Sequence, residues 1–254
     1  MWGPEPVRLR TTDHIVLSAS YYGSVSDGPS YVLGHGFTGS ASQPRVAAIA
    51  EHLNGRGASV LALDFRGHGQ SGGLSTVGVL ETADVAAGVE WLRARRPHAP
   101  VITLGFSMGA SIVVRHAGLG GSADAVVAVS GPGRWYERGT EPMRRVHFGV
   151  ETRLGRLALR LAFKTRVGGG WDLLPAAPVE VASAVAAPML VVHGDADAYF
   201  GVEHARMLAA AAPDAELWIE EGMGHAENAT TPELLDRIDE WARRAVRASA
   251  TMAP

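Results

Sequence analysis

Short apolar runs alternate with amphipathic segments along most of the chain. Residues 7–11 and 14–22 alternate apolar and polar positions around Thr12 and Asp13, which is typical of an antiparallel hairpin. Beyond it, continuous apolar runs lie at 31–33, 60–63, 101–104, 126–129 and 189–192, and a last short run lies at 217–219. Continuous runs of this length are typical of strands buried on both faces, as in a parallel sheet.

Helical segments separate most of these runs. Helix-forming residues with apolar positions spaced by three and four occupy 43–55, 78–96, 108–117, 202–212 and 232–247. Strands and helices that alternate after an opening hairpin predict an α/β fold: a mostly parallel, eight-stranded sheet with helices on both faces. In such sheets the functional groups gather beyond the carboxyl ends of the strands.

The interval 132–188 breaks the alternation. It is too long for a simple turn and contains its own helix-like part, roughly 142–165, followed by three glycines at 168–170. We interpret it as a small helical cap inserted over the site. The chain then divides into a first core part (1–131), a cap insertion (132–188) and a second core part (189–254).

Composition narrows the class of protein. A chain of 254 residues with 46% hydrophobic and 19% charged residues suits one soluble globular domain. A net charge of -3 argues against a nucleic-acid partner, and the absence of cysteine excludes disulfides, thiol nucleophiles and thiolate metal sites. We expect a cytoplasmic protein, since no signal-peptide pattern and no apolar stretch of ~18 residues is present.

The most informative motif is Gly-x-Ser-x-Gly at 105–109, between the apolar run 101–104 and a helical segment. A strand that turns abruptly into a helix places the middle residue in a strained conformation, and the flanking glycines let the chain pass close to itself. Ser107 is therefore expected to project alone from the edge of the sheet as a nucleophile.

Serine needs a base that takes its proton and an acid that orients the base. Asp197 follows the strand 189–192 and His225 follows the strand 217–219, so both are expected at the same edge as Ser107. Serine, acid, histidine is the chain order expected for this arrangement. Asp195 lies two residues from Asp197 and is the alternative acid.

Charge on the substrate carbonyl oxygen needs two backbone N–H donors. Met108 follows the nucleophile and supplies one of them. The other is expected from the segment Gly34-His35-Gly36-Phe37 after the strand 31–33, and we choose the N–H of Phe37. Together these two groups form the predicted oxyanion hole.

In these motifs the chain resembles the α/β-hydrolase superfamily over essentially its full length. The resemblance rests on the blocks 35–37, 64–71 and 105–109 and on the Asp197 and His225 loops, in that order. It implies Ser107 as nucleophile, His225 as general base and acid, Asp197 as its partner, and Phe37 and Met108 as oxyanion donors. In the short length of its insertion, the chain resembles the subgroup of intracellular esterases, monoacylglycerol-lipase-like proteins and serine-aminopeptidase-like proteins.

Two further patterns, a pair of histidines and a glycine-rich segment, suggest ligand sites, but we interpret both as structural features. His35 and His193 each precede a glycine at a strand end and could share a metal, but we expect buried, hydrogen-bonded loop residues and no metal, because no metal-ligand spacing is present. The segment 67–72 matches the dinucleotide fingerprint Gly-x-Gly-x-x-Gly. It does not open a first βαβ unit and lacks the downstream acid, so we expect a structural turn.

The cap segment is amphipathic. Its basic residues are Arg144, Arg145, Arg153, Arg156, Arg160, Lys164 and Arg166, and its apolar ones include Leu154, Leu157, Leu161 and Phe163. Peripheral contact with lipid is conceivable, but we expect leucines packed onto the protein and arginines in solvent. Substrate contacts in the cap are expected from Trp135, Tyr136, Phe148 and Trp171.

These residues predict a serine hydrolase that cleaves small-molecule carboxylic esters through an acyl-enzyme, without a cofactor. The same triad would serve a thioesterase, an amidase or peptidase, or a perhydrolase, and the sequence does not separate them. A non-catalytic binding protein on the same scaffold is the alternative from another class, and a complete triad argues against it. Oligomeric state is not predicted.

Overall fold

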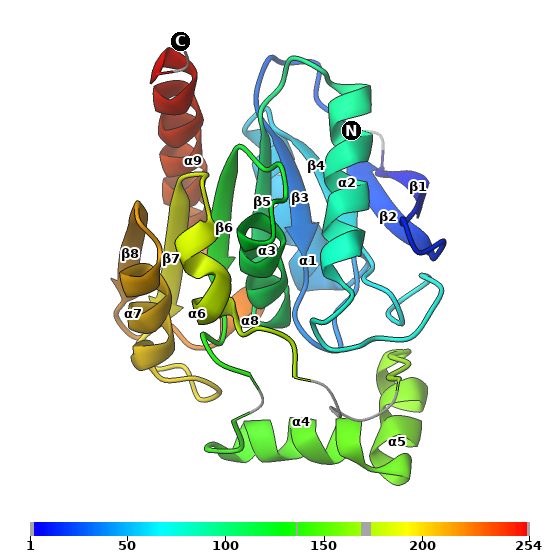
Figure 1. The fold of residues 1–254 in the computed structure, drawn as a ribbon. Helices are drawn as coiled ribbons and strands as arrows, with labels where there is room; N and C mark the ends of the chain where they lie inside the picture. Colours follow the sequence, from blue (N-terminus) through cyan, green and yellow to red (C-terminus); the bar gives the residue numbers. More distant parts are fainter. Residues whose placement is uncertain (1–2, 136, 169–173, 253–254) are drawn as a thin grey trace.

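The computed structural model describes residues 3–135, 137–168 and 174–252 (Figure 1). Its centre is one eight-stranded sheet with the order β1-β2-β4-β3-β5-β6-β7-β8. Only β1 with β2 and β2 with β4 pair antiparallel; the other pairs are parallel, as the pattern predicts. The strands are β1 (Glu5–Arg10), β2 (Val16–Tyr22), β3 (Ser30–Gly34), β4 (Ser59–Leu63), β5 (Val101–Phe106), β6 (Ala125–Val129), β7 (Met189–Gly194) and β8 (Ala215–Glu220).

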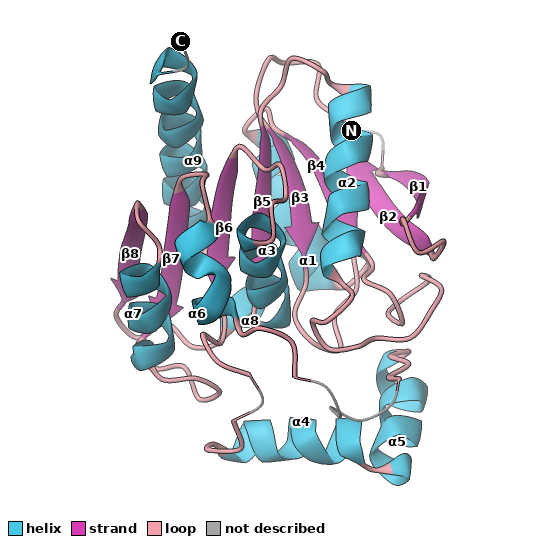
Figure 2. Ribbon diagram, in the orientation of Figure 1, coloured by secondary structure: helices cyan, strands magenta, loops and turns pink. Residues whose placement is uncertain are grey.

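Helices cover both faces of the sheet (Figures 1 and 2). Those of the core are α1 (Pro44–Gly55), α2 (Thr82–Arg95), α3 (Met108–Gly118), α6 (Pro178–Val181), α7 (Val202–Ala211), α8 (Ala226–Ala229) and α9 (Pro232–Met252), with a short 3-10 turn at Ala182–Ala184. Successive strand residues point to opposite sides: Val32 packs with α2 and α3, and its neighbours Tyr31 and Leu33 with α1 and α9. This double burial explains the continuous apolar runs.

The remaining helices, α4 (Glu141–Glu151) and α5 (Arg153–Phe163), lie beyond the carboxyl ends of the strands (Figure 1). We expected one helix-like part over 142–165, and the structure divides it at Thr152. The Thr152 hydroxyl accepts a hydrogen bond from the Gly155 N–H (2.9 Å) and caps α5. The bounds of the cap, 132 and 188, remain a prediction. Within these bounds, α6 packs on the core helices α3 and α7 rather than on α4 or α5 in the contacts of the described residues.

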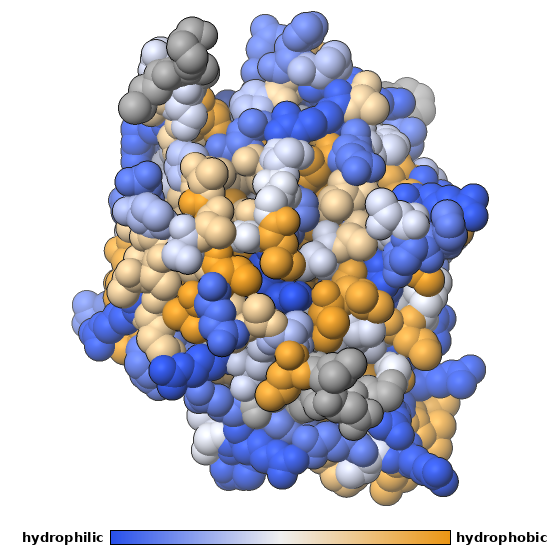
Figure 3. Space-filling model, viewed as in Figure 1, coloured by the Kyte–Doolittle hydropathy of each residue, from blue (hydrophilic) through white to orange (hydrophobic). Residues whose placement is uncertain are grey.

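The expected packing of the cap leucines is wrong. Leu154, Leu157 and Leu161 are 67%, 51% and 75% exposed, and Leu159 is the leucine of α5 that is buried. Figure 3 shows apolar residues on the outer side of α5. α5 packs mainly on α4 and over the cavity, so only one narrow face of the helix is covered. The leucines on its other faces are exposed to solvent.

The predicted helix 78–96 begins four residues later, at Thr82. The carboxylate of Glu81 accepts hydrogen bonds from the Ser75 and Thr76 hydroxyls and from the N–H groups of Thr76 and Gly78. This buried carboxylate holds the preceding residues as a loop, which apolar spacing alone did not reveal. In the described part of the chain, no helix combines the length and apolar character required to cross a membrane.

Candidate active site

Ser107 occupies the sharp turn between β5 and α3. Its backbone has φ 51° and ψ -115°, a left-handed conformation that is strained for a residue with a Cβ. A Cβ at Gly105 would lie 2.2 Å from the Gly109 carbonyl oxygen, and a Cβ at Gly109 would lie 2.5 Å from that of Gly34. The close approach of β3, β5 and α3 therefore requires both glycines of the motif.

The hydroxyl of Ser107 meets an imidazole from the other end of the chain. His225, in the loop after β8, places Nε2 2.9 Å from Ser107 Oγ and Nδ1 2.7 Å from Oδ2 of Asp197. A carboxylate can only accept hydrogen bonds, so Nδ1 carries the proton and Nε2 is free to accept from the serine hydroxyl. The three residues thus form a continuous hydrogen-bonded chain.

Asp197, rather than Asp195, makes this contact. Its side chain is fully buried, and its Oδ1 accepts hydrogen bonds from the Tyr199 (2.8 Å) and Phe200 (3.2 Å) N–H groups. Burial raises the pKa of Asp197, but the hydrogen bond and charge of His225 and these two N–H groups outweigh it, so the pKa lies below its ordinary value. Asp195 instead accepts the Gly222 N–H (2.7 Å).

The two predicted oxyanion donors line the same cavity as Ser107 and His225. Neither the Phe37 nor the Met108 N–H donates to any residue that the structure describes. The Gly36 carbonyl accepts hydrogen bonds from His35 Nδ1 (2.7 Å) and from the Gly39 N–H (2.9 Å). In a trans peptide the N–H points opposite to the C=O, so these bonds turn the Phe37 N–H away from His35.

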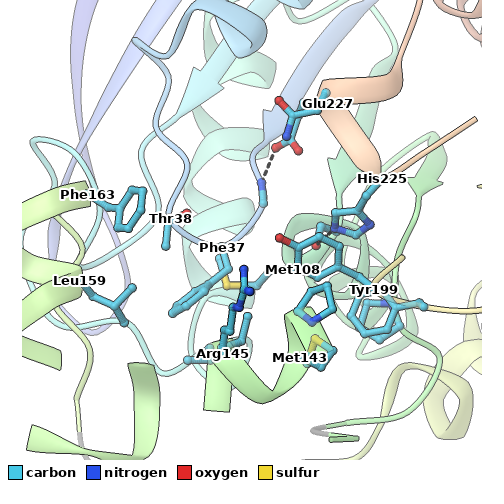
Figure 4. Close-up of a pocket in the computed structure, with 18 of the residues that line it drawn as sticks. Phe37, Thr38, Met108, Met143, Arg145, Leu159, Phe163, Tyr199, His225 and Glu227 are labelled. Atoms are coloured by element: carbon cyan, nitrogen blue, oxygen red, sulfur yellow. Dashed lines mark hydrogen bonds between the residues drawn. The ribbon is translucent and has the colours of Figure 1, made fainter. Parts of the chain in front are cut away.

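The cavity has a volume of about 500 Å³ and lies between the edge of the sheet and the cap (Figure 4). Most of its wall is apolar and comes from Phe37 in the loop 35–37 after β3 (the oxyanion loop, named for its predicted donor), from Met108 in the turn 105–109 (the elbow), and from α4 and α5. The lining residues of the two cap helices are Pro142, Met143, Arg145, Val146, Leu159 and Phe163. Such a cavity is suited in size and polarity to an acyl group.

Of the cap residues predicted to contact substrate, the structure brings Trp135 to the cavity. Its Nε1 donates to the Ala176 carbonyl (3.2 Å). Phe148 is not among the described lining residues, and its side chain is 52% exposed. Tyr136 and Trp171 lie outside the described residues. Tyr199 also lines the site but was not predicted from the sequence, because no motif marks this position. Its ring stacks on that of His225, with the two ring centroids 4.1 Å apart.

The two histidines considered for a metal form hydrogen bonds within the protein, although the buried Nδ1 of His193 has no partner among the described residues. His35 donates from Nδ1 to Gly36 and accepts the Phe65 N–H at Nε2 (3.2 Å), and burial lowers its pKa to about 4. His193 donates from Nε2 to the Phe200 carbonyl (3.0 Å). No group of three or more potential metal-binding side chains is found within the described ranges.

The glycine-rich segment 67–72 is a turn folded around Asp64. The Asp64 carboxylate accepts the N–H groups of Ala41 (2.7 Å) and Gln70 (2.8 Å), and a Cβ at Gly69 would lie 2.3 Å from one of its oxygens. The Gln70 N–H is thus bonded to a carboxylate rather than free for a phosphate oxygen, as a dinucleotide loop would require. The segment therefore has a structural role next to the oxyanion loop.

Three known proteins resemble this chain in sequence or in fold. A monoacylglycerol lipase from Mycolicibacterium smegmatis is 30% identical over 251 residues, which cover 83% of this chain and 86% of that one. The esterase Pf2001 from Pyrococcus furiosus is 25% identical, with a TM-score of 0.76 over 96% of this chain and 93% of that one. The α/β hydrolase GrgF from Penicillium sp. sh18, 17% identical, shares the fold with a TM-score of 0.77 over 97% of this chain and all of its own.

The fold and these relatives define an α/β hydrolase of the esterase and lipase type, an enzyme that hydrolyses ester bonds. Residues 30–171 match the model of the family described as serine aminopeptidase, S33. The chain belongs to this family.

Proposed function

We propose that the protein is a serine hydrolase that cleaves carboxylic esters through a covalent acyl-enzyme. The observation that carries this proposal is the hydrogen-bonded chain Ser107–His225–Asp197, with joining distances of 2.9 and 2.7 Å. Such a chain supplies the proton acceptor that a serine hydroxyl requires to attack a carbonyl at neutral pH.

In the first half of the reaction, Ser107 Oγ attacks the ester carbonyl while its proton moves to Nε2 of His225. The negative charge of the tetrahedral intermediate falls on the former carbonyl oxygen, where the Phe37 and Met108 N–H groups hold it. The ionised Asp197 stabilises the imidazolium. When the intermediate collapses, His225 returns the proton to the departing alcohol and the acyl group stays on Ser107.

In the second half, water replaces the alcohol. His225 takes a proton from the water as it attacks the acyl carbonyl, the same oxyanion hole holds the second intermediate, and collapse releases the carboxylic acid and restores the Ser107 hydroxyl. Every proton passes through one imidazole nitrogen, and the residues require no metal or cofactor for any step.

The substrate side of the proposal follows from the cavity. Leu159 and Phe163 of α5 line one side of the cavity that holds Ser107, and Met143 of α4 lines it near Tyr199 (Figure 4). We therefore propose esters of medium-length acyl chains, with monoacylglycerols as the first candidates because of the relative from Mycolicibacterium smegmatis. Trp135, Tyr136 and Trp171 remain proposed contacts, and the structure gives no support to Phe148.

Peptides are the second candidate substrate class, favoured by the description of the family. Thioesters and the use of peroxide in place of water would employ the same residues. Placement in the cytoplasm stays a prediction from composition. Lipid contact of the cap is the alternative that the sequence favours less. The exposed leucines of α5 support it, and sedimentation with anionic vesicles at low salt tests it.

The test is hydrolysis of p-nitrophenyl butyrate and a monoacylglycerol series by the wild type and Ser107→Ala. We expect activity only in the wild type, and labelling of the wild type alone by a fluorophosphonate probe. A peptide amide substrate in the same panel distinguishes the second candidate. Equal ester hydrolysis by the two proteins would remove Ser107 from the mechanism.

A further inference from the structure

Two charged side chains that line the cavity, Arg145 and Glu227, have no part in the mechanism above, and Glu227 is the one that contacts the loop of Gly36. Glu227 lies two residues after His225, on the short helix α8, and lines the cavity beside Ser107. Its Oε1 accepts a hydrogen bond of 2.5 Å from the Gly36 N–H, drawn as a dashed line in Figure 4. Gly36 immediately precedes Phe37, so the carboxylate holds the loop that carries one oxyanion donor.

We propose that Glu227 is a positioning residue, which fixes the oxyanion loop by holding the Gly36 N–H and so keeps the Phe37 N–H aimed at the developing oxyanion. The proposal rests on the proposed serine-hydrolase function. It assigns Glu227 no contact with the reacting atoms and no transfer of a proton.

The loop is held from both sides of one residue. At Gly36 the N–H donates to Glu227, and the carbonyl accepts from His35 Nδ1 and from the Gly39 N–H. The carbonyl bonds set the plane of the peptide that ends in the Phe37 N–H, and the Glu227 bond fixes the peptide before it. Without Glu227, Gly36 would keep the bonds on its carbonyl side only, and a glycine rotates more freely than any other residue.

Close packing at this point explains why Gly36 lacks a side chain. A Cβ there would lie 3.2 Å from Ser107 Cβ and 3.3 Å from both carboxylate oxygens of Glu227. The nucleophile and the carboxylate thus approach the same backbone atom from different elements. Any side chain at this position would push one of them away.

The turn after β8 places two side chains at once. Ala226 has a left-handed backbone (φ 51°), and its N–H donates to the Ser130 hydroxyl (3.1 Å). This conformation sends His225 toward Ser107 and Glu227 toward Gly36 (Figure 4). One segment therefore sets the distance between the base and the oxyanion loop.

The carboxylate stays in place although burial disfavours its charge. Burial raises the pKa of Glu227, against which the Gly36 hydrogen bond and the charge of His225 act. The bond to Gly36 requires only an acceptor oxygen, which both a carboxylate and an amide provide. This difference between acceptor and charge allows the proposal to be tested.

The test compares Glu227→Met, which keeps the volume and removes the acceptor, with Glu227→Gln, which keeps an acceptor oxygen and removes the charge. The control is Glu221→Met, at an exposed glutamate of the preceding loop. For each protein we would measure kcat and KM for p-nitrophenyl butyrate, the rate of fluorophosphonate labelling at Ser107, and the melting temperature. Should Glu227→Met not fold, Glu227→Ala takes its place.

We expect kcat of Glu227→Met to fall by about 10- to 100-fold with KM within threefold, because the oxyanion donor serves the transition state. Fluorophosphonate labelling should slow in parallel, while Glu227→Gln and Glu221→Met stay within fivefold of the wild type. The proposal is overturned if Glu227→Met keeps its kcat, if Glu227→Gln falls as far as Glu227→Met, or if KM alone changes. A wild type that neither turns over esters nor reacts with the probe would instead reject the serine-hydrolase function.

Discussion

The carboxyl edge of the sheet and the cap lie on either side of one cavity and are built in opposite ways. At the edge, Ser107, Asp197 and Phe37 lie in turns that are fixed by hydrogen bonds between side chains and backbone and by glycines at which a Cβ would collide with its neighbours. In the cap, α5 leaves Leu154, Leu157 and Leu161 more than half exposed. The edge sets the chemistry with fixed distances, and the cap contributes an apolar wall that tolerates change.

Among the substitutions that test this difference, we expect the largest effect, a loss of kcat, at Asp197. Asp197→Asn keeps the shape of the side chain but removes its charge. The Tyr199 and Phe200 N–H groups would hold the amide oxygen, so the NH2 group would face His225 Nδ1 and favour the tautomer with the proton on Nε2; kcat should therefore fall by about 10⁴-fold. Steady-state hydrolysis of p-nitrophenyl butyrate measures it. Asp195→Asn, two residues away and bound to Gly222, is the matched control and should change kcat little. The reverse order would make Asp195 the acid.

Replacing one leucine in the sheet and one in the cap shows how much each region contributes to the free energy of unfolding. Leu104 on β5 is fully buried, and Leu104→Ala should lower the free energy of unfolding by about 2 to 5 kcal/mol through lost burial and the resulting cavity. Leu161→Ala, at an exposed position of α5, should stay within about 0.5 kcal/mol. Urea unfolding measures both. Similar losses in the two variants would mean that α5 is covered in solution.

Below the edge, the buried Arg66 joins the fully buried Asp84 and the partly exposed Asp13. The Arg66 hydrogen bonds, partly opposed by burial, lower the pKa of Asp13 from its ordinary value of 3.8 to about 2. Because the folded-state pKa is the lower one, this stabilisation is present above about pH 4 and is lost as the pH falls toward 2. Asp13→Asn should cost about 1 kcal/mol at pH 7, after allowance for solvent screening.

The check on this prediction is urea unfolding of Asp13→Asn and the wild type at pH 7 and at pH 2.5. The gap between the two proteins should shrink at the lower pH. A gap that stays constant would show that Asp13 contributes through packing rather than charge.

The smallest effect is expected from the ion pair of the cap. Glu141 and Arg145 are joined on the surface of α4 at 2.5 Å, with both side chains well exposed. Glu141→Gln should change the free energy of unfolding by less than about 0.5 kcal/mol, since water and salt screen such pairs. A loss as large as that of Asp13→Asn, measured at pH 7, would remove the distinction between the two regions.

Local patterns predicted the sheet and the strand ends at which Ser107, Asp197 and His225 lie. Apolar runs mark the strands because both faces of this sheet are buried, and the glycines at 105 and 109 mark the elbow because side chains there would collide with neighbouring backbone. These features depend on residues close in sequence, and the parallel topology then brings the strand ends together.

Contacts between segments far apart in the chain could not be predicted from local sequence patterns. The loop before α2 depends on which atoms surround the Glu81 carboxylate, and the bond from Gly36 to Glu227 joins residues 191 positions apart. Helical periodicity likewise marks the leucines of α5 as apolar without saying whether anything covers them. The sequence specifies such positions only through the complete fold.

We propose that Ser107, activated by His225, forms the covalent intermediate. Rapid quenching of the reaction with p-nitrophenyl butyrate, followed by mass spectrometry of the intact protein and its peptides, tests it most directly. We expect a butyryl group on Ser107 during turnover and none in Ser107→Ala. Turnover at full rate with the wild-type protein unmodified, or with the acyl group on another residue, would contradict the claim.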